Sequence, residues 1–97
     1  MMIQYIGFQP KPRGREYSYR VVDPKTDPRE FTLTISHQAF SERHVLYQDA
    51  AGICYQRLQR ELATETEESP LRRHFTVSDQ DLDVYLAKHR PIRRRSS

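Results

Sequence analysis

The chain has 97 residues, of which 36% are hydrophobic and 30% are charged. This length suits one domain with one compact core and leaves no room for two. The formal net charge is +3, but residues 90–97 carry four arginines and no acid, so subtracting +4 from +3 leaves −1 for the rest. The basic character therefore resides in the tail, which argues only weakly for a nucleic-acid-binding fold.

Cysteine content and hydropathy indicate the cellular compartment in which the protein is expected. The single cysteine, Cys54, excludes an internal disulfide and fits a reducing environment. No apolar run reaches ten residues, so no segment is expected to span a membrane. Residues 1–5 lack the charged and apolar regions of a signal peptide. We expect a cytoplasmic protein.

The first expected element is a strand over residues 2–8, which are rich in residues that favour β structure. Gly7 within it indicates a bulge or a close approach of another backbone. Residues 9–14 are predicted to form a loop, because Pro10, Pro12 and Gly14 interrupt regular structure.

Two runs then alternate with a period of two residues, over 15–23 and 30–36, on either side of a proline-containing turn at 23–28. The apolar or aromatic members of each run fall on one face: Tyr17, Tyr19 and Val21 in the first run, and Phe31, Leu33 and Ile35 in the second. This pattern predicts an antiparallel hairpin with one buried face and one polar face.

Two helical segments should follow. Ser36 is expected to cap a short helical turn from His37 to about Arg43. Asp49 is the predicted N-cap of a longer amphipathic helix over 50–64, whose apolar stripe covers the sheet. The stripe comprises Ala51, Cys54, Tyr55, Leu58 and Leu62.

The last third of the chain begins with an expected loop over 64–73 and a short strand over 74–78. Ser78 and Asp81 have the spacing of a capping box, which predicts the start of a C-terminal helix. Its predicted packing face comprises Leu82, Tyr85, Leu86 and His89, and Pro91 should end it.

The expected order is therefore β-β-β-α-β-α. It describes an α+β fold, with a small antiparallel sheet covered by one main amphipathic helix and followed by a C-terminal helix. We expect a single domain over residues 1–90 and a disordered basic tail over 91–97.

No motif indicates catalysis, a metal site or a cofactor, so we expect a non-enzymatic protein. The histidines His37, His44, His74 and His89 are spread over separate elements and lack the spacing of zinc ligands. The triplet Asp79, Asp81 and Asp83 resembles the first acids of a calcium loop, but its glycine and distal glutamate are missing, and acids suit a helix start. Cys54 falls in the packing stripe, which favours a core thiol over a nucleophile.

The absence of such motifs, the thin core and the tyrosine content favour a protein-interaction or self-associating module, with an unidentified protein or a second copy as partner. Tyrosine and arginine are enriched at interfaces. The tyrosines available for a surface role are Tyr5, Tyr17, Tyr19, Tyr47 and Tyr55. An exposed sheet edge would be the simplest place for a partner strand to add.

The alternative is a nucleic-acid-binding accessory protein. Its candidate phosphate or anion contacts lie on the first loop, the second strand and the tail: Lys11, Arg13, Arg15, Arg20, Arg93, Arg94 and Arg95. Glu16, Asp23 and Glu30 lie among the first four and would weaken the attraction to phosphate.

Overall fold

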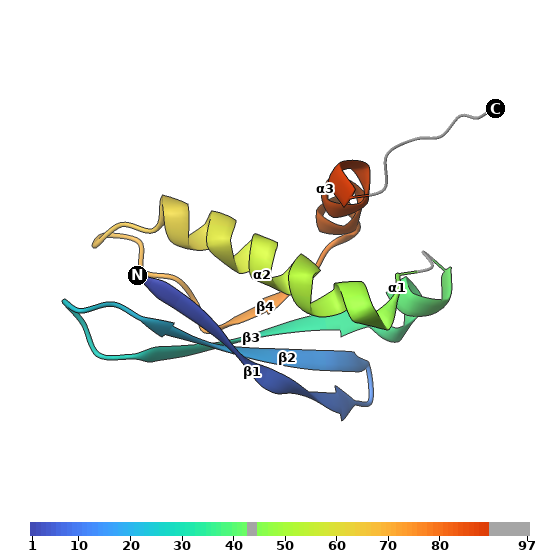
Figure 1. The fold of residues 1–97 in the computed structure, drawn as a ribbon, viewed down its shortest axis with the longest axis horizontal. Coiled ribbons are helices and arrows are strands. Elements are labelled where there is room, and N and C mark those ends of the chain that lie inside the picture. Colours follow the sequence, from blue (N-terminus) through green and yellow to red (C-terminus); the bar gives the residue numbers. More distant parts are fainter. Residues whose placement is uncertain (43–44, 90–97) are drawn as a thin grey trace.

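The computed structural model describes residues 1–42 and 45–89. Its elements, in chain order, are β1 (Met2–Lys11), β2 (Gly14–Val22), β3 (Arg29–Ser36), α1 (His37–Glu42), α2 (Tyr47–Thr64), β4 (His74–Thr76) and α3 (Asp79–His89). Figure 1 shows the helices on one side of the sheet, with α2 lying across it. The predicted α+β class, the main covering helix and the C-terminal helix are confirmed. The predicted tail at 91–97 lies outside the described residues.

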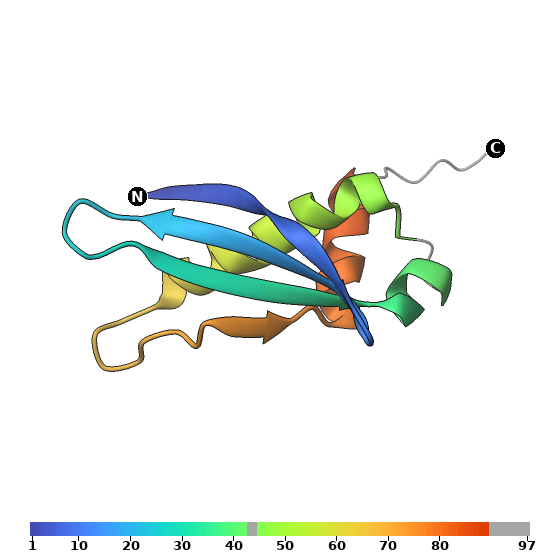
Figure 2. The same cartoon turned by 90° about the horizontal axis from the view of Figure 1, so that it is seen from below.

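The sheet has four strands in the order β1-β2-β3-β4, and β1 and β4 form its two edges (Figure 2). The two pairings among β1, β2 and β3 are antiparallel, as predicted, but β4 pairs with β3 in parallel, so the sheet is mixed. The helices between β3 and β4 explain this difference, because a crossover through a helical layer returns the chain in its original direction.

The core forms between the sheet and α2. The predicted apolar faces of β2 and β3 are confirmed, since all six side chains named for them are buried. The buried residues of α2 are Ala50, Ile53, Cys54, Leu58 and Leu62. The predicted stripe was therefore partly wrong: Ala50 and Ile53 face the core, whereas Tyr55 is exposed. Within the described part of the chain, no helix is both long and apolar enough to cross a membrane.

The start of α2 differs from the prediction. The helix begins at Tyr47, Leu46 occupies the N-cap position without a side-chain hydrogen bond, and Asp49 lies in the first turn. The Tyr47 ring packs against Phe40 with a centroid separation of 4.7 Å. Such tertiary packing extends a helix beyond its local capping signal, and Asp49 still interacts favourably with the helix dipole.

The predicted loop at 9–14 is also wrong, because β1 continues to Lys11 and Lys11 pairs with Gly14 across a tight turn. Strand prolines are tolerated on an edge strand where the missing N–H faces away from the ladder, and Pro10 fits that position. The bulge expected at Gly7 is confirmed by a register shift between Tyr5 and Gly7, where Gly7 has φ 156°.

The capping box of α3 is confirmed. The Ser78 N–H donates to Asp81 Oδ2 at 2.9 Å, and the Asp81 N–H donates to Ser78 Oγ at 3.2 Å. These reciprocal bonds satisfy two donors that a helix start otherwise leaves unpaired.

Two neighbouring tyrosines on β2 provide a matched test of the core. The Tyr19 hydroxyl donates to the Ala51 carbonyl of α2. The Tyr17 hydroxyl is buried and makes no hydrogen bond of good geometry among the described residues, although the Arg15 guanidinium lies near it. Tyr19→Phe should lower the free energy of unfolding by about 1 kcal/mol, and Tyr17→Phe should leave it unchanged or raise it. Urea unfolding measures both, and an equal loss in the two variants would contradict the assignment.

Candidate interaction edge along β1

β1 bonds to the sheet on one side only, and the register identifies which of its backbone groups face outward. The Thr32 N–H donates to the Arg73 carbonyl, and the Val77 N–H donates to the Thr34 carbonyl, so Thr32 and Thr34 direct their backbone groups to β4. Backbone direction alternates along a strand. Leu33 therefore faces β2, and its partner Tyr17 faces β3.

The same alternation continues to β1. The β2 residues that alternate with those facing β3 direct their backbone groups to β1 instead. On β1, Gly7, Gln4 and the residues that alternate with them form these hydrogen bonds. The residues of β1 left with backbone groups directed to the open side are Ile3, Tyr5, Phe8 and Pro10. We call these four the edge-directed residues. Pro10 offers only a carbonyl, so its ring costs the β1–β2 ladder no hydrogen bond.

The side chains of β1 are unusually exposed for apolar groups. Tyr5 is 48% exposed, Ile6 54% and Phe8 45%. Tyr5 and Phe8 lie on the helix-facing side and pack against rings of β2, with centroid separations of 5.4 Å for Tyr5–Tyr19 and 5.5 Å for Phe8–Tyr17. Figure 2 shows α2 crossing the sheet obliquely toward β1, and both rings nevertheless remain about half exposed.

Arg15 connects the Phe8 ring to α2. Its guanidinium carbon lies 4.5 Å from the Phe8 ring centroid and 3.8 Å from that of Tyr47, a separation typical of a cation–π contact. Tyr47 itself is exposed. The structure therefore places the charge of Arg15, a candidate anion contact, between two aromatic rings.

The other predicted cationic contacts do not form one patch with Arg15. Arg20 lies on the opposite, polar face of the sheet, where it pairs with Gln4 and Glu30. Lys11 lies 3.8 Å from Glu16, and Arg13 is in the turn between β1 and β2. The remaining candidates, Arg93, Arg94 and Arg95, lie outside the described residues.

Lys11 and Arg13 share a shallow cavity of about 430 Å³ at the turn end of the polar face. Glu16 and His74 also line it, with His74 Nδ1 3.9 Å from the Glu16 carboxylate and 2.5 Å from Thr32 Oγ1. An acid at the centre of the group offsets its positive charge, which disfavours a strong anion site.

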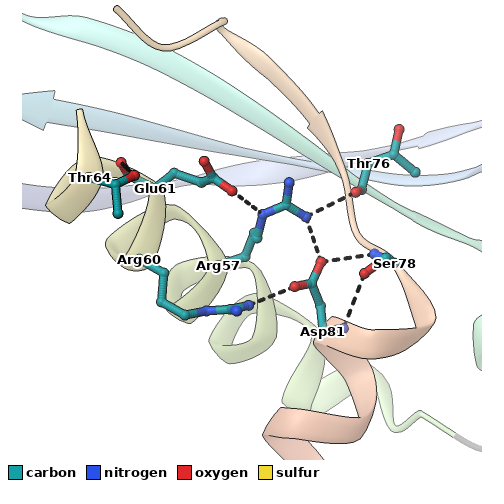
Figure 3. Close-up of polar contacts among 7 residues, drawn as sticks. All are labelled: Arg57, Arg60, Glu61, Thr64, Thr76, Ser78 and Asp81. Carbon is teal, nitrogen blue, oxygen red and sulfur yellow. Dashed lines mark hydrogen bonds and ion pairs between the residues drawn. The ribbon is translucent and has the colours of Figure 1, made fainter. Parts of the chain in front are cut away.

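A cluster of ion pairs joins α2 to α3 (Figure 3). Arg57 donates to Asp81 Oδ2 at 2.5 Å and to Glu61 Oε2 at 2.9 Å, and Arg60 donates to Asp81 Oδ1 at 2.6 Å. A further bond runs from Arg57 to the Thr76 carbonyl at 3.2 Å. Sequence pattern did not indicate this cluster, because the partner of both arginines, Asp81, comes from a later element.

The cluster makes stability depend on pH. Burial alone would raise the pKa of Asp81, but the Ser78 N–H and the Arg60 and Arg57 guanidinium groups outweigh it and hold that pKa below its usual value. The pKa of Glu65 is also lowered, chiefly by its hydrogen bond from Arg29. A carboxyl with a lowered folded pKa stabilises the fold above its unfolded pKa, and loses that contribution as pH falls through the folded value.

We therefore expect the free energy of unfolding to fall as the pH drops below about 4, the usual range of carboxyl groups. Asp81→Asn should lower the free energy of unfolding near neutral pH. It should also make that free energy fall less steeply in acid, because it removes one titrating group. Urea unfolding over an acidic pH series measures both effects. Stability that stays constant into strong acid would contradict the assignment.

Three comparisons with known proteins give no relative: no family model, no curated protein and no solved structure matches the chain. Among residues 1–42 and 45–89, no group of three or more His, Cys, Asp or Glu side chains is arranged to hold a metal ion. Cys54 is fully buried, and burial raises the pKa of its thiol. The geometry of β1 is therefore the observation on which a functional argument rests.

Proposed function

We propose that this chain is a non-enzymatic protein-interaction module that binds an extended protein segment along the free edge of β1. In such strand addition, main-chain hydrogen bonds supply affinity and alternate side chains supply specificity. The edge-directed residues offer the backbone groups, and Tyr5 and Phe8 offer open aromatic rings beside them. The single buried cysteine supports a reducing compartment such as the cytoplasm.

The observation that carries this proposal is the length and character of the edge. β1 has ten residues and β4, at the other edge, has three. Folded proteins usually protect a long edge strand with charge, proline or a covering segment. On β1 the protective residues, Pro10 and Lys11, are confined to one end, whereas Tyr5, Ile6 and Phe8 leave the middle exposed and apolar. Such an edge is suited to a partner strand.

A backbone variant tests this role. Tyr5→Pro removes an N–H directed to the open edge while leaving the β1–β2 ladder its hydrogen bonds, and Tyr5→Ala is the matched control that loses the same ring but keeps the N–H. Binding should weaken roughly tenfold more in the proline variant than in the alanine variant, the value of one hydrogen bond. Sedimentation and co-purification from the source cell measure binding, and circular dichroism confirms folding.

Two results would reject the proposal. One is a strict monomer that retains no protein partner. The other is a complex that tolerates Tyr5→Pro and Tyr5→Ala equally, because its interface would then lie elsewhere. Binding to nucleic acid at low salt, unaffected by either variant, would favour the alternative function instead.

A further inference from the structure

We propose, resting on the function proposed above, that the strand bound at this edge is β1 of a second copy of the chain. The two β1 strands run antiparallel about a two-fold axis that passes between Ile6 and Gly7. The inference depends on the order of the residues along β1, which is self-complementary in an antiparallel pair, and on the charge of the strand.

The bulge in β1 is compatible with pairing to a second copy. Along the free edge, the step from Tyr5 to Phe8 is three residues, whereas the steps from Ile3 to Tyr5 and from Phe8 to Pro10 are two. β2 meets this step of three with a step of two, from Tyr19 to Tyr17, and stays in register on both sides of the bulge. On the free edge, a second copy running antiparallel has its own step of three at the same place, so the edge-directed residues of the two copies face one another on both sides of the bulge.

In this register every edge-directed residue meets another. Tyr5 lies opposite Phe8 of the second copy, and Ile3 lies opposite Pro10 of the second copy. Directly opposed aromatic side chains stabilise a sheet. On the polar face, Gln4 lies opposite Gln9 of the second copy, where each amide group both donates and accepts.

The charge of β1 permits self-pairing. Its ten residues include one charged side chain, Lys11, at the C-terminal end. Antiparallel pairing places the two Lys11 side chains at opposite ends of the interface, each facing Met2 of the other copy. No like charges on β1 then meet, although directly opposed like charges commonly destabilise strand pairs.

A pair of cysteine variants tests the register. The backbone groups of Gln4 and Gln9 point toward β2, so these residues would form a non-hydrogen-bonded pair across the dimer, where Cα atoms lie about 4.5 Å apart. That separation lies within the range that a disulfide spans. Gln4→Cys and Gln9→Cys full-length chains are mixed under oxidised glutathione, and the linked peptides are identified by mass spectrometry. Cys54 stays in place because its thiol is buried.

The expected result is a 4–9 disulfide at least tenfold more abundant than the 4–4 or 9–9 species. Arg20→Cys mixed with Gln9→Cys is the matched control. Arg20 is exposed and lies beside Gln4 on the same face of the sheet, but it belongs to β2, the strand next to the edge. A cysteine at this position should therefore not form a disulfide with the second copy. A predominance of 4–4 or 9–9 disulfides, or of the control disulfide, would overturn this register.

Sedimentation over a wide concentration range separates this inference from the function on which it rests. A concentration-dependent dimer that Tyr5→Pro weakens supports both. A monomer that captures a different protein, with Tyr5→Pro abolishing the capture, overturns the second copy and leaves strand addition intact. A monomer whose protein contacts ignore Tyr5→Pro overturns both.

Discussion

Gly14→Ala is expected to lower the free energy of unfolding by about 3 kcal/mol or more. A Cβ at this position would lie 2.0 Å from the Ile35 carbonyl oxygen and 2.8 Å from the Ser36 Cα. Both neighbours belong to the backbone of β3, so neither can turn away as a flexible side chain would. Relief of the clash therefore requires separation of β2 from β3 at the end where β3 meets α1.

Urea unfolding monitored by circular dichroism measures this loss. Gly52→Ala is the matched control, because its Cβ would meet chiefly the end of the Tyr85 side chain, with the hydroxyl at 3.1 Å. Alanine also favours a helix over glycine by about 1 kcal/mol, so the control should change stability little or raise it. Equal stability of Gly14→Ala and the parent protein would show that the two strands do not approach this closely.

Asp81→Ala should cost about 3 kcal/mol, the lower end of the range for removing one partner of a buried ion pair. The Asp81 carboxylate accepts hydrogen bonds from Arg57, Arg60 and the Ser78 N–H. Its loss removes half of the capping box and leaves the partly buried Arg57 with a missing counter-charge. We expect the contact between α2 and α3 to weaken first.

Thermal unfolding and amide hydrogen exchange of α3 measure this effect. Asp79→Ala is the matched control, because Asp79 is an exposed acid in the same helical turn and its main contribution is to the helix dipole. That contribution is about 0.3–1 kcal/mol. If both variants lost the same small amount, the cluster at Asp81 would not hold the helices together.

Local pattern predicted the parts of the fold that depend on neighbours in sequence. Alternation along β2 and β3 identified the buried faces, because side chains on a strand alternate between the two sides of a sheet. The spacing of Ser78 and Asp81 identified the start of α3, because a capping box is a local hydrogen-bond pattern. Gly7 similarly indicated the bulge.

Tertiary contacts determined what the pattern missed. The loop expected at Pro10 is a strand because that proline faces the open edge, which sequence alone did not identify. Arg15 alternates with Glu16 as any strand residue would, but Phe8 and Tyr47 converge on it from other elements. The role of Arg57 depends on Asp81, which lies 24 positions later. The composition predicted an interaction role without its location, and the strand order supplies the candidate edge.

The shortness of β4 has a consequence for assembly size. In the proposed dimer the two β1 strands pair with each other at the centre of the joined sheet. Each outer edge of that sheet is then β4, which has three residues. So short a boundary gives a further chain little template for polymerisation. Because the pairing is two-fold and uses the same surface on each chain, it closes at two subunits and does not propagate into a fibre.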